Sequence, residues 1–135
     1  MTTSDSPETH ADNARQALRQ LAHATRYLGD PTQIYPILGD LSNGLASFAQ
    51  SLHQMAAFHE GPVREHPQQA GDARAGRAAS YHVAWELHRA GDMLAQTAKT
   101  LDKAHELEAT IAYDIRESDL SIATRRPRHG DGLSL

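Results

Sequence analysis

Histidine and acidic side chains are the groups in this chain that could bind a metal ion or transfer protons. The chain has nine histidines and 17 aspartates and glutamates among 135 residues, and it has no cysteine. Two metal ligands on one helix must be three or four residues apart to share a face. His53 and His59 are six residues apart, as are His82 and His88, so each pair points to different sides of a helix. This spacing predicts no metal site and no cofactor.

Asp102, His105 and Glu108 form the one close group of such residues. Helix bundles that bind two metal ions carry Glu-x-x-His on two helices, whereas here the order is reversed and there is no second copy. His105 and Glu108 lie on the apolar stripe of their helix, and buried polar groups need partners. We expect a structural polar layer there, beside the junction of the first two helices. The side chains available at that junction are His23, Arg26, Tyr27 and Tyr35.

No other residues form an arrangement typical of an enzyme. No serine, histidine and acid make a recognisable nucleophile setting, and no carboxylate pair falls in an identifiable apolar pocket. The Gly-Asp and Asp-Gly dipeptides are turn sequences rather than phosphate-binding loops. We therefore predict a non-enzymatic protein with no catalytic residues.

The elements that position these side chains are helices. Three stretches carry apolar residues at alternating steps of four and three, which is the pattern of helices that pack along one side. The middle stretch is unbroken: Ile34, Leu38, Leu41, Leu45, Phe48, Leu52 and Met55. No stretch alternates as a strand would. The predicted fold is all-α, a three-helix bundle with antiparallel hairpins and coiled-coil-like seams.

Capping residues, prolines and glycines set the predicted boundaries. Ser6, Pro7 and Glu8 are typical of a helix start. The predicted helices cover residues 7–28, 31–60 and 73–117, with a loop at 61–72. Pro36 predicts a kink or a separate first turn at 31–35. One helical domain is expected over 7–120, flanked by disordered tails at 1–6 and 121–135.

The third stretch carries two stripes that repeat every seven residues, Leu87-Leu94-Leu101 and Ala84-Gly91-Ala98. At roughly 65 Å, a helix over 73–117 would be about twice as long as either earlier helix. One antiparallel partner cannot cover such a helix, and an alanine-rich core with 5% aromatic residues buries little apolar area. We therefore predict a homo-oligomer that associates through this helix.

The only tryptophan lies on a second face of the same helix, with Tyr81, Trp85, His88 and Asp92. Two interpretations remain open. Trp85 could pack against another part of the bundle, or it could anchor a protein partner, since tryptophan and tyrosine concentrate at binding hot spots. We favour the partner slightly, because His88 and Asp92 continue this face with polar groups.

Composition and charge narrow the remaining classes. There is no apolar run of 18 residues and no signal-peptide core, so we expect no membrane insertion and a cytoplasmic location. The net charge of -4 argues against a general nucleic-acid coat protein. A nucleic-acid accessory role through Arg125, Arg126 and Arg128 remains a further hypothesis, although a solvated basic tail is favoured.

Tyr113 is followed four residues later by Glu117, after two helices predicted to be antiparallel. In these features the chain resembles the helical hairpins of actinobacterial type VII secretion, of the WXG type. Their export signal is a tyrosine followed four residues later by an acid, just past the second helix. The Trp-x-Gly turn of that group is missing, because Trp85 precedes Glu86 and Leu87. The resemblance implies secretion by a type VII-like route as the alternative location, with Tyr113 and Glu117 as the signal.

Composition adds a second resemblance. Arginine outnumbers lysine, and alanine is abundant. The chain looks like the small helical proteins of actinobacterial genomes, and this likeness implies no activity.

Overall fold

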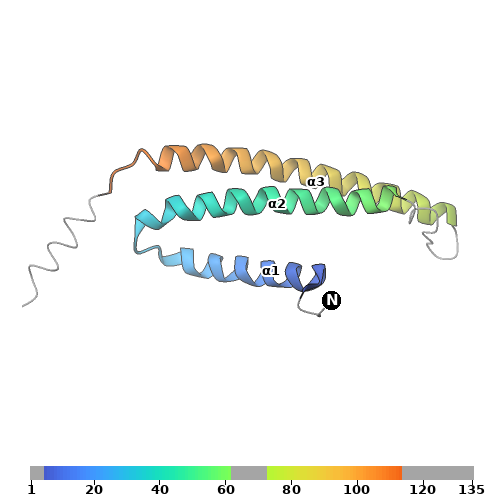
Figure 1. Ribbon diagram of the computed structural model, residues 1–135, viewed down its shortest axis with the longest axis horizontal. Coiled ribbons are helices and arrows are strands. Elements are labelled where there is room, and N and C mark those ends of the chain that lie inside the picture. The colour runs from blue at the N-terminus through green and yellow to red at the C-terminus, as the bar shows by residue number, and fades with distance from the viewer. Residues whose placement is uncertain (1–4, 62–72, 114–135) are drawn as a thin grey trace, which may run out of the picture. The chain divides into compact units, whose positions relative to one another are not determined.

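The computed structural model describes residues 5–61 and 73–113. These residues form three α-helices and no strand: α1 (Pro7–Ala24), α2 (Ile34–Glu60) and α3 (Ala73–Glu108) (Figure 1). The prediction of an all-α fold is confirmed. The chain divides into two compact units, Met1–Thr32 with α1 and Gln33–Leu135 with α2 and α3. Over the described ranges, every helix is too short or too polar to be a membrane span.

Helix α1 begins at the residues that the sequence indicated. The Ser6 side chain accepts a hydrogen bond of 3.1 Å from the backbone N–H of Thr9, and Pro7 occupies the first helical position. The helix ends at Ala24, earlier than the predicted Leu28. The Thr25 hydroxyl donates to the Leu21 carbonyl oxygen at 2.9 Å, and the chain continues as a short 3-10 turn, η2 (Thr25–Tyr27). A side chain that bonds a carbonyl of the last turn competes with further α-helix.

Helix α2 accommodates Pro36 without interrupting its 27 residues. A separate 3-10 turn, η3 (Pro31–Gln33), comes first, and α2 starts at Ile34. Of the two predicted alternatives, this is close to a separate first turn at residues 31–35. Pro36 then lies in the first turn, where backbone N–H groups have no partner within the helix and a proline costs little. The helix ends before Gly61, as predicted.

Helix α3 is shorter than predicted, because it ends at Glu108 rather than near Glu117. Beyond that residue, the Thr110 N–H and hydroxyl both bond the Leu107 carbonyl oxygen, at 3.0 and 2.7 Å. These contacts tighten the last turn and replace the α-helical pattern. The 36 residues of α3 span about 54 Å instead of 65 Å. Residues 114–117 lie outside the described part of the chain.

Helices α2 and α3 lie side by side as an antiparallel hairpin (Figure 1). The most buried side chains are small on both helices. On α2 they include Ser42, Ala49 and Ala56, which are seven residues apart, and on α3 they include Ala84, Gly91 and Ala98. We call these six residues the small-residue contact line. Small side chains on both sides allow the two helix axes to approach closely.

The contact line differs from the predicted seam of α2. Leu52 is buried, but Phe48 and Met55 keep 49% and 48% of their surface exposed. These two residues each precede a contact-line alanine by one position, so they project about 100° to one side of it. The sequence analysis predicted that the large apolar residues of α2 face the partner helix, whereas the small residues make the closest contact.

Candidate functional site

Polar side chains connect α2 to α3 along the hairpin. The Ser42 hydroxyl donates to the Asp102 carboxylate and lies 3.1 Å from the Ala98 carbonyl oxygen. The Ser80 hydroxyl is 3.0 Å from the Nδ1 atom of His59. Both serines are buried, at 5% and 6% exposure, so these bonds satisfy groups that would otherwise be costly to bury. They fix which residues of the two helices face each other.

A pair of histidines joins the helices between these serines. Nδ1 of His53 lies 2.7 Å from Nδ1 of His88, and the two ring centroids are 5.0 Å apart. The other nitrogen of each ring faces a carboxylate. Nε2 of His88 is 3.0 Å from Glu60, and Nε2 of His53 is 3.3 Å from Asp92. We call these four residues the histidine cluster.

Gly91 gives the His53 ring its space. A Cβ atom at position 91 would lie 2.6 Å from Nε2 and 2.9 Å from Cδ2 of that ring, which is far inside normal contact. The ring therefore lies directly over the α3 backbone. A residue other than glycine at this position would displace it.

The predicted polar layer forms in part. The His105 ring stacks on Tyr35, one of the partners expected for it, with ring centroids 3.9 Å apart and planes at 18°. Glu108 accepts a hydrogen bond from the Tyr113 hydroxyl. This bond is the main cause that raises the pKa of Tyr113 above its ordinary value, with smaller contributions from desolvation and from the Glu108 charge.

The residues predicted for self-association fall into two groups. Ala84, Gly91 and Ala98 are buried against α2 of the same chain, so the small stripe packs within the hairpin. Leu87, Leu94 and Leu101 lie beside it and are half-buried. The small stripe of α3 was predicted to contact a second chain, but in the structure it packs on the equally small stripe of α2 in the same chain.

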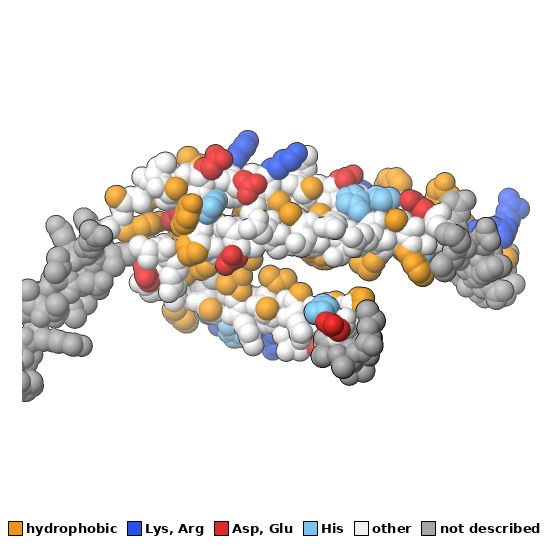
Figure 2. Space-filling model, in the orientation of Figure 1, with side chains coloured by type: hydrophobic (Ala, Val, Ile, Leu, Met, Phe, Trp, Pro, Cys, Tyr) orange, Lys and Arg blue, Asp and Glu red, His pale blue; other side chains and the backbone are white. Residues whose placement is uncertain are grey.

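The aromatic face of α3 is open on the hairpin. Tyr81 and Trp85 keep 60% and 59% of their surface exposed, and the Arg89 guanidinium lies 5.5 Å from the centre of the Trp85 ring. Trp85 borders two shallow depressions, one with Arg77 and Tyr81 and the other with His88 and Asp92. Hydrophobic side chains also reach the surface elsewhere on α2 and α3 (Figure 2).

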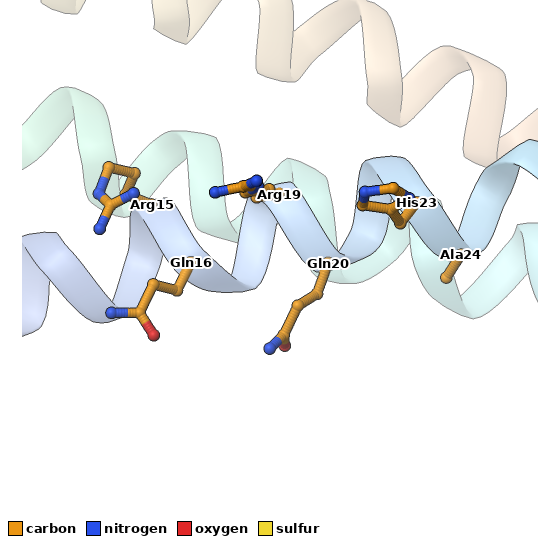
Figure 3. Close-up of a pocket in the computed structure, with 6 residues that line it drawn as sticks. All are labelled: Arg15, Gln16, Arg19, Gln20, His23 and Ala24. Carbon is orange, nitrogen blue, oxygen red and sulfur yellow. The ribbon is translucent and has the colours of Figure 1, made fainter.

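Helix α1 carries a shallow polar depression of its own. Arg15, Arg19 and His23 form one row, with Gln16, Gln20 and Ala24 beside them (Figure 3). Arg15 is bound to Asp12 at 2.7 Å. All the lining residues come from a single helix, so the depression encloses nothing, and we interpret it as a polar helix surface.

Several predicted residues lie outside the described ranges. They are Glu117 of the candidate export signal and the basic residues Arg125, Arg126 and Arg128. Tyr113 is described and lies five residues past the end of α3.

Two features of the hairpin were not predicted from the sequence. The α2 stripe of Ser42, Ala49 and Ala56 could have been found from its spacing of seven. The His53–His88 pair could not, because a search for ligands within one helix does not reveal which residues meet between two helices.

Within residues 5–61 and 73–113, no group of three or more histidine, aspartate or glutamate side chains could hold a metal ion. Comparisons with known proteins found no matching family model, no matching curated protein and no matching solved structure.

Proposed function

We propose that this chain is a non-enzymatic interaction protein whose α2–α3 hairpin binds a second copy of itself. The observation that supports the proposal is the number of large apolar side chains exposed on this hairpin. They are Tyr35, Phe48, Met55, Phe58, Tyr81, Val83, Trp85, Met93 and Leu107, each at least 42% exposed. Exposed apolar side chains that gather on one side of a small protein are typical of an association surface.

One side of the hairpin suits self-association through α3. Phe48 and Met55 precede Ala49 and Ala56 by one residue, and Val83 precedes Ala84 in the same way. Because the helices are antiparallel and face each other, residues that precede the contact line on both helices project to the same side. The half-buried Leu87, Leu94 and Leu101 border this side. Phe48, Met55 and Val83 therefore belong to one apolar surface, with the leucine stripe at its edge.

Sedimentation of the full chain at micromolar concentration tests the proposal. We expect a dimer or larger species, and a melting temperature that rises with protein concentration. Val83→Asp should shift the protein towards monomer, because it places a charge on the apolar surface. His82→Asp is the matched control, since it introduces the same group at an exposed neighbouring position. A wild type that stays monomeric, or an equal effect of both variants, would reject self-association through this surface.

A second candidate function is export as a type VII-like hairpin. It is supported by the position of Tyr113, which follows the second helix of an antiparallel helical pair, where that export signal is expected. Tyr113→Ala should then reduce the yield of the protein outside the producing cells. The control is Tyr27→Ala, because Tyr27 is 87% exposed and lies far from this segment in the sequence. Equal extracellular yields of the two variants would exclude the export role.

A further inference from the structure

Arginine and aromatic side chains share one face of α3. Arg77, Tyr81 and Trp85 each come one position after a buried residue of this helix. They therefore project about 100° to the same side of the line that packs on α2. Arg74 lies two turns before Tyr81, and Arg89 lies one turn after Trp85, so both arginines are on this side as well. We call these five residues the arginine–aromatic face.

The arginine–aromatic face is exposed and positively charged. All five of its residues are exposed, and residues 73–85 of α3 include no aspartate or glutamate. Among the described residues, neither Arg77 nor Arg89 forms an ion pair with a carboxylate. The Arg89 guanidinium lies 5.5 Å from the centre of the Trp85 ring, where it adds positive charge to an aromatic surface. The face thus combines cations with an apolar centre, on a chain whose net charge is -4.

This face is separate from the self-association surface. Val83 precedes the buried Ala84, whereas Trp85 follows it. The positions before and after one helical residue project about 160° apart. Phe48 and Met55 lie on the side of Val83, so a partner on the arginine–aromatic face leaves the self-association surface uncovered.

The shape of the face suits a long partner rather than a small molecule. Both depressions beside Trp85 are shallow and are lined by α3 alone, so neither encloses a ligand. From Arg74 to Arg89 the face extends over 15 helical steps, or about 22 Å. Another helix of similar length can lie along it and place its apolar side against the aromatic rings.

We propose that the arginine–aromatic face binds an acidic amphipathic helix of a partner protein. Its carboxylates pair with the arginines, and its apolar side chains cover Tyr81 and Trp85. Arginine binds carboxylates with two parallel hydrogen bonds, and tryptophan and tyrosine are typical anchors of protein interfaces. The two carboxylates of the histidine cluster, Glu60 and Asp92, lie beyond Trp85. The acidic residues of the partner are therefore directed towards the Arg77 end of the face.

The distribution of charge favours a protein partner over a nucleic acid. A nucleic-acid strand is negative along its whole length, and its affinity depends on many phosphate contacts. The face offers three arginines, while Asp92 lines the same depression as Trp85 and Glu60 contacts His88 beside it. A helix can place uncharged or basic side chains opposite these two carboxylates, whereas a phosphate backbone cannot.

The fluorescence of Trp85 measures binding directly, because it is the only tryptophan of the chain. The probes are two synthetic amphipathic peptides of about 15 residues, the length that covers the face. Both carry leucine on one side, one carries glutamate and the other lysine on the opposite side, and neither contains tryptophan. The glutamate peptide should shift the emission of the full-length wild type to the blue in a saturable way, and binding should weaken as salt is added. The lysine peptide should cause no shift.

This comparison uses only the wild-type chain, so it does not depend on whether a variant folds. Absence of a shift with the glutamate peptide would overturn the proposal. Equal shifts with both peptides would also overturn it, because they would show apolar contact without charge recognition. A single-stranded oligothymidylate that binds more tightly than the glutamate peptide would assign the face to nucleic acid instead.

Charge reversal on the protein provides the second test. Arg77→Glu should weaken binding of the glutamate peptide about tenfold, because an attraction becomes a repulsion. Arg19→Glu is the control, since Arg19 is an exposed arginine of α1 and the change alters the net charge equally. An equal loss of affinity in the two variants contradicts the proposal.

The variant Val83→Asp separates this proposal from self-association. It should bind the glutamate peptide as tightly as the wild type does, whether or not the wild type forms a dimer. Loss of peptide binding in Val83→Asp would place the peptide on the self-association surface and overturn the inference.

Discussion

Replacing Gly91 by alanine tests the packing of the hairpin at a single atom. The new Cβ would lie 2.6 Å from Nε2 of His53, whereas ordinary contact begins near 3.4 Å, so the ring must move by about 0.8 Å. A movement of that size can lengthen the 2.7 Å hydrogen bond to His88 to about 3.5 Å, beyond the usual range. Gly44 is the matched comparison, because it lies in α2 and a Cβ there would meet nothing within 4 Å.

The expected energies have opposite signs at the two positions. Alanine in place of glycine stabilises a helix interior by about 1 kcal/mol. At Gly91 this gain is offset by the displacement of the His53 ring from its hydrogen bond with His88, because a polar group left without its partner costs about 1–3 kcal/mol. Gly91→Ala should therefore destabilise the protein by up to about 2 kcal/mol, and Gly44→Ala should stabilise it by about 0.5–1 kcal/mol.

Urea unfolding followed by circular dichroism measures both changes at one protein concentration. A third variant isolates the cause. In a His53→Ala background the obstacle is gone, so adding Gly91→Ala should now stabilise the protein by about 1 kcal/mol. If Gly91→Ala stabilises the wild type as much as Gly44→Ala does, the His53 ring does not lie over Gly91 and the reasoning is refuted.

Three further predictions concern single side chains. Leu52→Ala should lower the free energy of unfolding by about 2–4 kcal/mol, because Leu52 is buried. Gln50→Ala, at an exposed position of the same helix, should change it little. Equal urea midpoints for the two variants would show that the helix phase is wrong. Trp85→Ala should weaken binding of a protein partner but lower monomer stability by only about 1 kcal/mol or less, since Trp85 is 59% exposed. Blue-shifted emission of the free protein with a large stability loss would place Trp85 in a core instead. Because Glu108 raises the pKa of Tyr113, tyrosinate absorbance should appear at higher pH in the wild type than in Glu108→Gln, and identical titration curves would disprove the assigned cause. The stabilisation from this bond should be complete below the ordinary tyrosine pKa and lost as pH rises through the raised value.

The helices of this chain were predictable because their signals are local. Ser6 and Pro7 at the start of α1, and Gly61 after α2, act through the backbone of their own turn. The end of α3 was missed for a related reason. Thr110 stops the helix by bonding a carbonyl of the preceding turn, an interaction that apolar spacing does not reveal.

The contacts between helices were harder to predict, since they depend on how far one helix is shifted along the other. His105 was expected near Tyr35, and the two rings do stack, because both lie at the same end of the hairpin. His53 was compared only with His59 on its own helix, although its partner is His88 on the next. The predicted seam included Phe48 and Met55 because they are large and apolar, but Ala49 and Ala56 are the residues that are buried against α3.

The small-residue contact line also determines how the stability of the hairpin changes with temperature. The heat capacity of unfolding grows with the apolar area that becomes exposed to water. Alanine, glycine and serine contribute little such area, and the described residues include no large side chain that is fully buried. The hairpin should therefore have a small heat-capacity change and a flat stability curve. Its enthalpy of unfolding should vary little between cold and warm conditions, and cooling should weaken the fold less than in a domain of equal size with a leucine-rich core.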